Sequence, residues 1–366
     1  ADRVSTVFAN EPSLLHSSQR AFQRNGDTGQ CVDMALDVME DYHREKKGQS
    51  ELFALSYDQA KAYDSVQQYS IRCTLERFGF PEEAVSFFCS TLENAYSAVR
   101  THGGNTERFP VHTSVRQGDP FAPILFIMIA DVLHRGYTDG HAGRSGPGSG
   151  VGYTFAHGEE PLTVASCGYA DDVMVFAESA EGLRRMHEWT RSFFGAHAFK
   201  LNTKKTKLTT TAPLHEVQGG FFSVDGRSCI EPAGPGEDFR YLGVRITLNM
   251  SWKAEMRRLQ GHVNRVGASI RTHGMTCTSG VGAVNSYLVP QLDLGLRIIP
   301  HSQGFMKTLQ SWTNQLQDDI LLAQGAWLRR PNRDAFCEVT GMVDLARYCC
   351  YTRTALAVQR LNTRDS

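Results

Sequence analysis

Two aspartates stand side by side between apolar stretches, in the sequence CGYADDVMVF at positions 167–176. The wider segment 162–179 predicts two short strands joined at Asp171 and Asp172. Adjacent carboxylates repel each other, and a hard divalent cation relieves that excess of negative charge. A plain hairpin turn is the alternative, because Asp is a good turn former. A metal site would need a third carboxylate from elsewhere in the chain.

Asp58 supplies a candidate for that third carboxylate, at the end of a strand predicted over 51–58. If this strand and the hairpin are neighbours in one sheet, three carboxylates converge at one edge. Three carboxylates suit two divalent cations about 3.5–4 Å apart, the arrangement of polymerases and nucleases. Mg²⁺ is the expected ion, because the ligands are hard oxygens and Mg²⁺ works with substrate phosphates.

The chain has 366 residues, too many for one small core, so at least two subdomains are expected. Strands and helices mix over the first 250 residues, and the remainder is α-rich. Apolar periodicity and stop signals predict helices over 30–47, 65–78, 81–96, 121–135, 180–194 and 252–271. The Gly-rich stretch 136–152 is expected to be an exposed loop.

The charges divide unevenly along the chain. Residues 1–239 carry 22 Lys and Arg against 31 Asp and Glu, and residues 240–366 carry 16 against 8. An acidic front and a basic back fit a catalytic acid cluster beside a module that binds a polyanion, with chance surface variation as the alternative. No apolar run approaches the roughly 18 residues of a membrane span, so no membrane partner is expected. Nine cysteines without a CxxC pair indicate reduced thiols of an intracellular protein.

Five stretches together resemble the palm motifs of reverse transcriptases. They are YDQAKAYD (57–64), SVRQGDPFAPILF (114–126), YADD (169–172), LNTKKTK (201–207) and FRYLG (239–243). The closest resemblance is to the non-LTR, LINE-like branch of retrotransposons. QRAFQRNGDT (19–28) is similar to that branch's upstream fingers motif, and SYLVPQLDLGLR (286–297) to a stretch after its palm. Five motifs in this order are far more specific than any one of them.

The resemblance implies an α+β, right-hand polymerase fold, with an antiparallel palm sheet, partial fingers and a helical thumb. Residues 1–250 would form the fingers and palm, and residues 251–366 the thumb and a C-terminal extension. The implied activity is an RNA-directed DNA polymerase that joins dNTPs to a primer 3′-OH. Its partners would be an RNA template and a DNA primer, and its cofactors two Mg²⁺ ions, with Mn²⁺ as a substitute. Neither the motifs nor the composition indicate an oligomeric state.

By the same resemblance, Asp58, Asp171 and Asp172 are the catalytic, metal-binding acids, and the first two are the principal ligands. Lys205 would protonate the leaving pyrophosphate, although a solvated basic loop is the plainer interpretation. The remaining expected roles are substrate-binding for Tyr63, Gln117 and Gly118, and primer-binding for Tyr241, Leu242 and Gly243. Tyr63 would block a ribose 2′-OH, and the alternative is a core tyrosine. The primer-binding segment has a buried strand and turn as its alternative.

The sequence departs from the family at the upstream motif, where Ala21 precedes Phe22 and the motif ends in Asn25 and Gly26. Arg24 is the substitute candidate for the substrate-binding arginine of the fingers. The chain starts without Met and is expected to be a fragment. A remnant that only binds nucleic acid and a group II intron maturase-like reverse transcriptase are the alternative functions. The expected location is intracellular, and nuclear in a eukaryotic host.

Overall fold

The chain divides into two compact units in the computed structural model. Unit 1 comprises residues 1–242 and 247–250, and unit 2 comprises residues 243–246 and 251–366. The structure describes residues 2–23, 26–93, 95–111, 113–115, 118–139, 151–156, 161–217, 219, 221, 223–325 and 331–364. Each unit buries its own set of apolar side chains.

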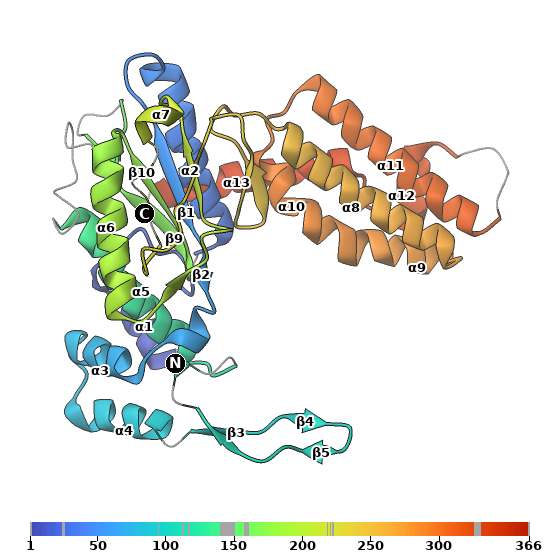
Figure 1. Cartoon of the computed structure of the whole chain (residues 1–366). Coiled ribbons are helices and arrows are strands. Elements are labelled where there is room, and N and C mark those ends of the chain that lie inside the picture. The colour runs from blue at the N-terminus through green and yellow to red at the C-terminus, as the bar shows by residue number, and fades with distance from the viewer. Residues whose placement is uncertain are drawn as a thin grey trace. The chain divides into compact units, whose positions relative to one another are not determined.

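A five-stranded sheet lies at the centre of unit 1 (Figure 1), in the order β13-β12-β1-β10-β9. The strands are β1 (Phe53–Tyr57), β9 (Ser166–Tyr169), β10 (Asp172–Ala177), β12 (Lys207–Thr210) and β13 (Pro232–Ala233). The pairs from β12 to β9 are antiparallel, as expected. The β12–β13 pair is parallel, which corrects the expectation of a wholly antiparallel sheet. The connection between these two strands is long enough for the crossover that parallel pairing requires.

The two faces of the sheet bury alternate residues of each strand, as the period of two requires. Val173 and Val175 of β10 belong to the apolar core that also contains residues of helices α5 (Ala122–Thr138) and α6 (Ala180–Ala196). Met174 and Phe176 alternate with them and are fully buried too. A strand buried on both faces reads as a continuous apolar run, which explains the sequence VMVF.

The remaining helices of unit 1 are α1 (Asp2–Asn10), α2 (Thr28–Asp41), α3 (Gln68–Arg77), α4 (Glu82–Glu93) and α7 (Leu214–Val217). Helix α2 begins where the Asp27 carboxylate accepts a hydrogen bond from the Gln30 amide, and α6 begins with the same kind of cap from Ser179. Helix α2 contacts β9, and α6 contacts β10. Helices lie where the sequence predicted them in this part of the chain, except that α4 ends at Glu93 and Tyr96 already belongs to a strand.

Short antiparallel strand pairs complete unit 1. They are β2 (Gln59–Ala60) with β11 (Lys200–Leu201), β3 (Tyr96–Ser97) with β6 (Phe109–Pro110), β4 (Arg100–Thr101) with β5 (Gly104–Asn105), and β7 (Tyr153–Thr154) with β8 (Thr163–Val164). Strand β14 (Phe239–Tyr241) lies at the end of this unit's main segment. Strand β2 begins directly after Asp58, the residue that separates it from β1.

The expectation of an exposed loop over 136–152 is wrong at both of its ends. Helix α5 continues to Thr138, and both Val151 and Gly152 are buried, each bridged to Ala177 of β10. Residues 140–150 lie outside the described residues. Glycine content indicates a loop only locally, and here tertiary contacts hold the end of the segment in the core.

Helices dominate the described part of unit 2 (Figure 1). They are α8 (Lys253–Thr272), α9 (Cys277–Gly282), α10 (Val289–Ile298), α11 (Gln303–Ala323), α12 (Arg333–Thr340) and α13 (Leu345–Arg364), with strand β15 (Val244–Ile246) before them. Helix α8 packs against α11. Apolar side chains at helical spacing along α8 are buried, namely Leu259, Val263, Val266 and Ile270. The helix predicted over 252–271 is confirmed.

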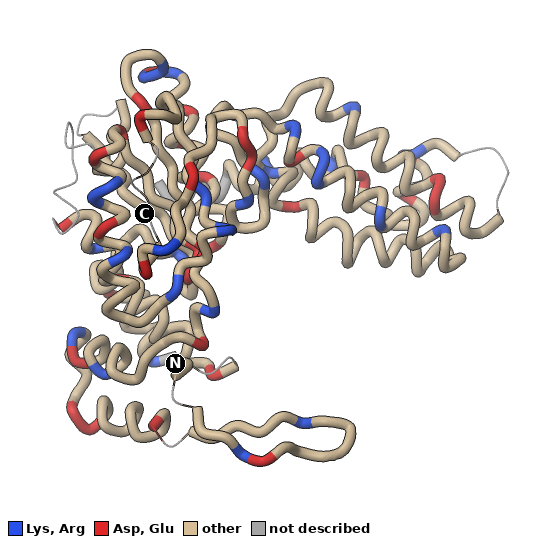
Figure 2. Tube along the Cα trace, viewed as in Figure 1, with Lys and Arg blue, Asp and Glu red and all other residues tan. Residues whose placement is uncertain are grey.

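Basic residues recur along α8 (Figure 2), but two of them are already paired inside the unit. Arg258 forms an ion pair with the buried Glu255, and Arg271 with Asp319. Arg257 and Arg265 are exposed. Of the four arginines that decorate this helix, these two are therefore the better candidates for contacts with a polyanion.

None of the helices formed by the described residues combines the length and the apolar character that a membrane span requires.

Candidate active site

The strand register places Asp58 level with the aspartate pair. Strands β1 and β10 are antiparallel, with Tyr57 opposite Val173. One residue further along, Asp58 leaves β1 beside Asp172, where β10 begins. The expected convergence of a strand end and a hairpin at one edge of the sheet is what the register produces. Asp58 keeps 31% of its side chain exposed, so its carboxylate is open to solvent.

A tight turn presents Asp171. Tyr169 of β9 pairs with Asp172 of β10, so only Ala170 and Asp171 lie between the strands. We call residues 169–172 the acid turn. Ala170 has a φ of +56°, in the left-handed region. Two-residue hairpin turns require positive φ, and a residue with a Cβ pays roughly 1–2 kcal/mol for it.

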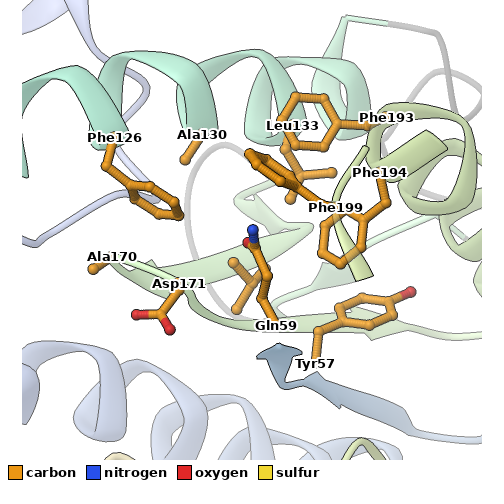
Figure 3. A pocket seen from close by; sticks show the side chains of 11 residues that line it. Tyr57, Gln59, Phe126, Ala130, Leu133, Ala170, Asp171, Phe193, Phe194 and Phe199 are labelled. Atoms are coloured by element: carbon orange, nitrogen blue, oxygen red, sulfur yellow. The ribbon is translucent and has the colours of Figure 1, made fainter. Parts of the chain in front are cut away.

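An apolar cavity lies behind the acid turn (Figure 3). Phe126, Phe193 and Phe199 are among its lining residues. Figure 3 shows the Asp171 carboxylate directed away from these rings, whereas the Gln59 side chain points toward them. The Gln59 Nε2 atom is buried and has no hydrogen-bond partner among the residues that the structure describes. Asp171 therefore lies at the rim of this mainly apolar cavity, with its carboxylate directed away from it.

Burial and mutual repulsion disfavour the ionised forms of the two adjacent acids. Burial raises the pKa of Asp171, and the charge of Asp58 raises it further. The pKa of Asp172 rises to about 6, through burial first and then through the charges of Asp171 and Asp58. Arg240 and Lys205 act in the opposite direction on the pKa of Asp172. Excess negative potential of this kind is what a divalent cation relieves.

The donor set fits Mg²⁺ by its chemistry, because all three side chains offer hard carboxylate oxygens at a partly exposed edge. Over the part of the chain that the structure describes, no three acidic, His or Cys side chains are arranged to enclose a metal ion. Mg²⁺ usually binds through one or two carboxylates, waters and substrate phosphates rather than in an all-protein cage.

The raised pKa of Asp172 predicts an unusual dependence of stability on pH when divalent ions are chelated. Its folded-state pKa of about 6 exceeds the ordinary value of 3.8, so the folded chain holds more protons between about pH 4 and pH 6. This carboxyl therefore makes the free energy of unfolding fall as pH rises through that window. Asp172→Asn should reduce this decrease in the free energy of unfolding. The measurement is urea denaturation in EDTA at pH 4.5 and pH 7.

Asp64→Asn is the matched control, because Asp64 is exposed on the same segment of unit 1. It should leave the pH dependence as in the wild type. Equal pH dependence in the wild type and Asp172→Asn would contradict the electrostatic account of the acid turn.

The segment 202–206 holds the backbone of Asp58. The Asn202 amide donates to the Asp58 carbonyl at 2.9 Å, and the Asp58 amide donates to the Thr206 hydroxyl at 3.2 Å. This brings Lys205 Nζ to 3.8 Å from Asp58 Oδ2, with 70% of the lysine side chain exposed. An exposed pair of this length contributes little stability, so the ammonium group is free to reach other anions.

Tyr63 lies beside the acids on a 3₁₀ turn (Tyr63–Ser65). Its ring stacks on Phe126, with centroids 4.9 Å apart. Burial, then the charge of Asp171 and the phenol of Tyr169, raise the pKa of Tyr63 to about 12. The half-buried ring is thus stacked on Phe126 of α5, and it lies close enough to Asp171 for that charge to raise its pKa.

The segment before the RQGDP motif is tied to the Tyr63 turn. The Val115 amide donates to the Tyr63 carbonyl at 3.0 Å, and the Thr113 hydroxyl donates to the Asp64 carbonyl at 2.9 Å. Gly118 has a φ of +94°, a conformation that glycine adopts without strain. Gln117 and Arg24, two of the expected substrate-binding residues, lie outside the described residues.

The predicted primer-binding segment consists of one buried residue, Tyr241, and a turn formed by Leu242 and Gly243. Tyr241 is 1% exposed, and its hydroxyl lies 3.3 Å from the Cys167 Sγ atom of β9. Its side chain is therefore a core anchor, as the plainer interpretation held. Leu242 and Gly243 have φ angles of +45° and +92°, which form a sharp backbone turn directly after it.

Two residues beside the acid turn escaped the sequence analysis. Arg240 acts on Asp172 electrostatically, and the only available signal was its place inside the FRYLG motif. Gln19 hydrogen-bonds to Ala170 across 151 positions of sequence. No local pattern could have indicated that contact, although Gln19 opens the stretch that resembles an upstream fingers motif.

Several known proteins are similar to this chain. A retrovirus-related Pol polyprotein from a type-2 retrotransposable element of Drosophila melanogaster is 28% identical over 225 residues, which cover 60% of this chain and 20% of that protein. A Pol polyprotein from a type-1 element of Popillia japonica is 24% identical over 368 residues, 96% of this chain and 47% of that protein. The chain therefore spans less than half the length of these relatives.

Among solved structures, apo telomerase from Candida tropicalis has a TM-score of 0.47 at 12% identity, over 96% of this chain and 60% of that chain. Telomerase from Candida albicans with a fragment of telomeric RNA has a TM-score of 0.44 at 11% identity, over 92% and 52%.

The family described as reverse transcriptase (RNA-dependent DNA polymerase) matches residues 1–246. That span covers well over half of the 366 residues and includes the acid turn and Asp58. The retrotransposon relatives also confirm the resemblance to the non-LTR branch, and the maturase-like and remnant alternatives gain no support from them. With the α+β fold described above, these matches establish that the chain belongs to the reverse transcriptase family.

Proposed function

We propose that this chain is an RNA-directed DNA polymerase domain of a non-LTR retroelement, which extends a DNA primer on an RNA template with dNTPs. The observation that carries the proposal is the register of β1 and β10, because it brings Asp58 beside Asp171 and Asp172. Family membership supports the reaction class. The raised pKa values of the acid turn supply the electrostatic reason for cation binding.

Asp58 and Asp171 would be the principal ligands of two Mg²⁺ ions, with Asp172 beside them and Mn²⁺ as a substitute. When bound, such ions lower the pKa of the attacking hydroxyl and neutralise charge on the leaving oxygen. The aspartates themselves contribute fixed negative charge at an edge that remains open to solvent. Asp171 lies at the rim of a cavity lined mainly by apolar side chains.

The proposed reaction is an in-line displacement at phosphorus. A bond forms between the primer 3′-oxygen and the α-phosphorus of a dNTP, the bond to pyrophosphate breaks, and the hydroxyl proton is released. Lys205 would supply a proton to the leaving pyrophosphate, a role that its exposure and its place 3.8 Å from Asp58 support. Tyr63 would form the wall that a ribose 2′-OH meets.

The other roles follow from the family alone. Gln117 and Gly118 would support the template base, Arg24 would contact substrate, and the Leu242–Gly243 turn would hold the primer, with Tyr241 as its buried anchor. A thumb in residues 251–366 would meet duplex phosphates through Arg257 and Arg265. The proposed location is inside the cell, in the nucleus if the host is eukaryotic.

Primer extension tests the proposal. The purified chain is given an RNA template annealed to a DNA primer, dNTPs and Mg²⁺. We expect extension that follows the template sequence when the dNTPs are added singly, stops in EDTA and returns in part with Mn²⁺. Absence of extension by a folded chain that still binds the duplex would contradict the proposal and favour the remnant alternative.

A further inference from the structure

A single buried side chain satisfies both backbone groups of Ala170 in the acid turn. Gln19 is fully buried. Its Oε1 atom accepts a hydrogen bond from the Ala170 amide at 3.0 Å, and its Nε2 atom donates to the Ala170 carbonyl at 3.3 Å. The same Oε1 atom also accepts from the Ala21 amide at 3.0 Å. Gln19 thus forms hydrogen bonds to both backbone groups of the residue that immediately precedes Asp171.

The backbone around Gln19 is fixed to β9 as well. The Arg20 amide donates to the Gly168 carbonyl at 2.9 Å, and the Gly168 amide donates to the Ser18 carbonyl at 2.8 Å. On the other side, a Cβ atom on Gly168 would lie 2.7 Å from the ring of the buried His134. Segment 18–20 therefore approaches the hairpin closely and cannot shift without moving β9.

Ala170 needs such support because its φ of +56° is unfavourable for a residue with a Cβ. Without Gln19, the buried amide and carbonyl of Ala170 would lose their partners, and the turn would relax toward an ordinary conformation. Asp171 follows directly, so a change in the backbone at Ala170 redirects the Asp171 carboxylate. The contact therefore acts on the orientation of an acid rather than on its charge.

We propose that Gln19 is a positioning residue for the proposed polymerase reaction: its amide holds Ala170 in the left-handed conformation that aims Asp171 at the substrate. This inference rests on the proposed function for its effect on catalysis. The contact itself is testable without any activity. Outer-shell groups that orient metal-binding side chains commonly have large effects on metal affinity and rate.

The test uses Gln19→Met, which keeps volume and removes the hydrogen bonds, alone and combined with Ala170→Gly. Glycine adopts positive φ without strain, so the double variant depends less on the hydrogen bonds from Gln19 to hold the turn. Gln68→Met is the matched control, because Gln68 donates to the Leu92 carbonyl of α4, away from the acid turn.

In single-turnover primer extension, we expect Gln19→Met to lower the rate by about 10- to 100-fold, the cost of a small misplacement of reacting groups. The Mg²⁺ concentration for half-maximal rate should rise roughly tenfold. In the Ala170→Gly background the same substitution should cost only about threefold, because the two positions are coupled. A purely structural role would lower the folded fraction and leave the Mg²⁺ requirement and the background dependence unchanged.

Amide hydrogen exchange separates this inference from the proposed function. In the wild type, the Ala170 amide should exchange slowly, and Gln19→Met should release it while the Gly168 amide stays protected by Ser18. Fast exchange of Ala170 in the wild type would overturn the inference, whether or not the chain polymerises DNA. So would an active Gln19→Met variant with unchanged rate and Mg²⁺ requirement. A wild-type chain with a protected Ala170 amide but no activity would contradict only the proposed function.

Discussion

Asp171→Asn should reduce nucleotide incorporation by at least about 10³-fold, since several kcal/mol of charge stabilisation are lost and each 1.4 kcal/mol is about a factor of ten. Asparagine keeps the shape of the side chain and removes its charge. The Asp171 carboxylate faces outward from the apolar cavity, so the substitution changes little packing (Figure 3). Asp58→Asn should have an effect of similar size. The measurement is single-turnover primer extension on an RNA template.

The matched control is Asp64→Asn, which removes an exposed carboxylate from the 3₁₀ turn after Asp58. Its rate should stay within about threefold of the wild type, as for most surface substitutions. Binding of the primer–template duplex should survive in all three variants. A rate for Asp171→Asn within tenfold of the wild-type rate would contradict a catalytic role for the acid turn.

Tyr63→Val should weaken the preference for dNTPs over ribonucleotides by about 10- to 100-fold, the range of discrimination that shape alone provides in a pocket. The Tyr63 ring is stacked on Phe126 and lies in the field of Asp171, so it forms a rigid wall beside the acids. Valine leaves space where the ring stood, and a 2′-OH then fits. The measurement is the ratio of kcat/KM for a dNTP and the matching ribonucleotide.

Tyr63→Phe separates the ring from its hydroxyl and should keep the selectivity. Tyr69→Val provides a control for loss of a tyrosine elsewhere in unit 1, because Tyr69 is exposed on α3. An unchanged nucleotide ratio in Tyr63→Val would show that this ring does not meet the sugar.

The positions of the acids could be predicted from the sequence because each stands at the end of a strand that local composition indicates. Their convergence then needed only the assumption that β1 and β10 pair, and the register satisfies it. Helix α8 could likewise be predicted from the spacing of apolar residues within its own segment. In contrast, alternation within the FRYLG segment could not say whether Tyr241 faces a ligand or the core. Its burial depends on Cys167, a residue 74 positions away.

Contacts between distant segments account for the remaining errors. The parallel pairing of β12 with β13 depends on where the connection returns the chain, which no strand pattern records. The buried end of the Gly-rich stretch depends on bridges to Ala177. Gln19 is the clearest case. Its residue type and its sequence neighbours are ordinary, and only its contact with Ala170 distinguishes it.

The close approach of Gly168 to His134 limits the order in which this hairpin can change over evolution. A side chain at position 168 would collide with the imidazole ring, so it requires a smaller residue at position 134. That replacement opens a void beside Ser166, whose hydroxyl lies 2.9 Å from the His134 Nδ1 atom. Substitutions at 134 and 168 are therefore expected to be tolerated as a pair and rejected singly, so that drift at either site depends on the history of the other.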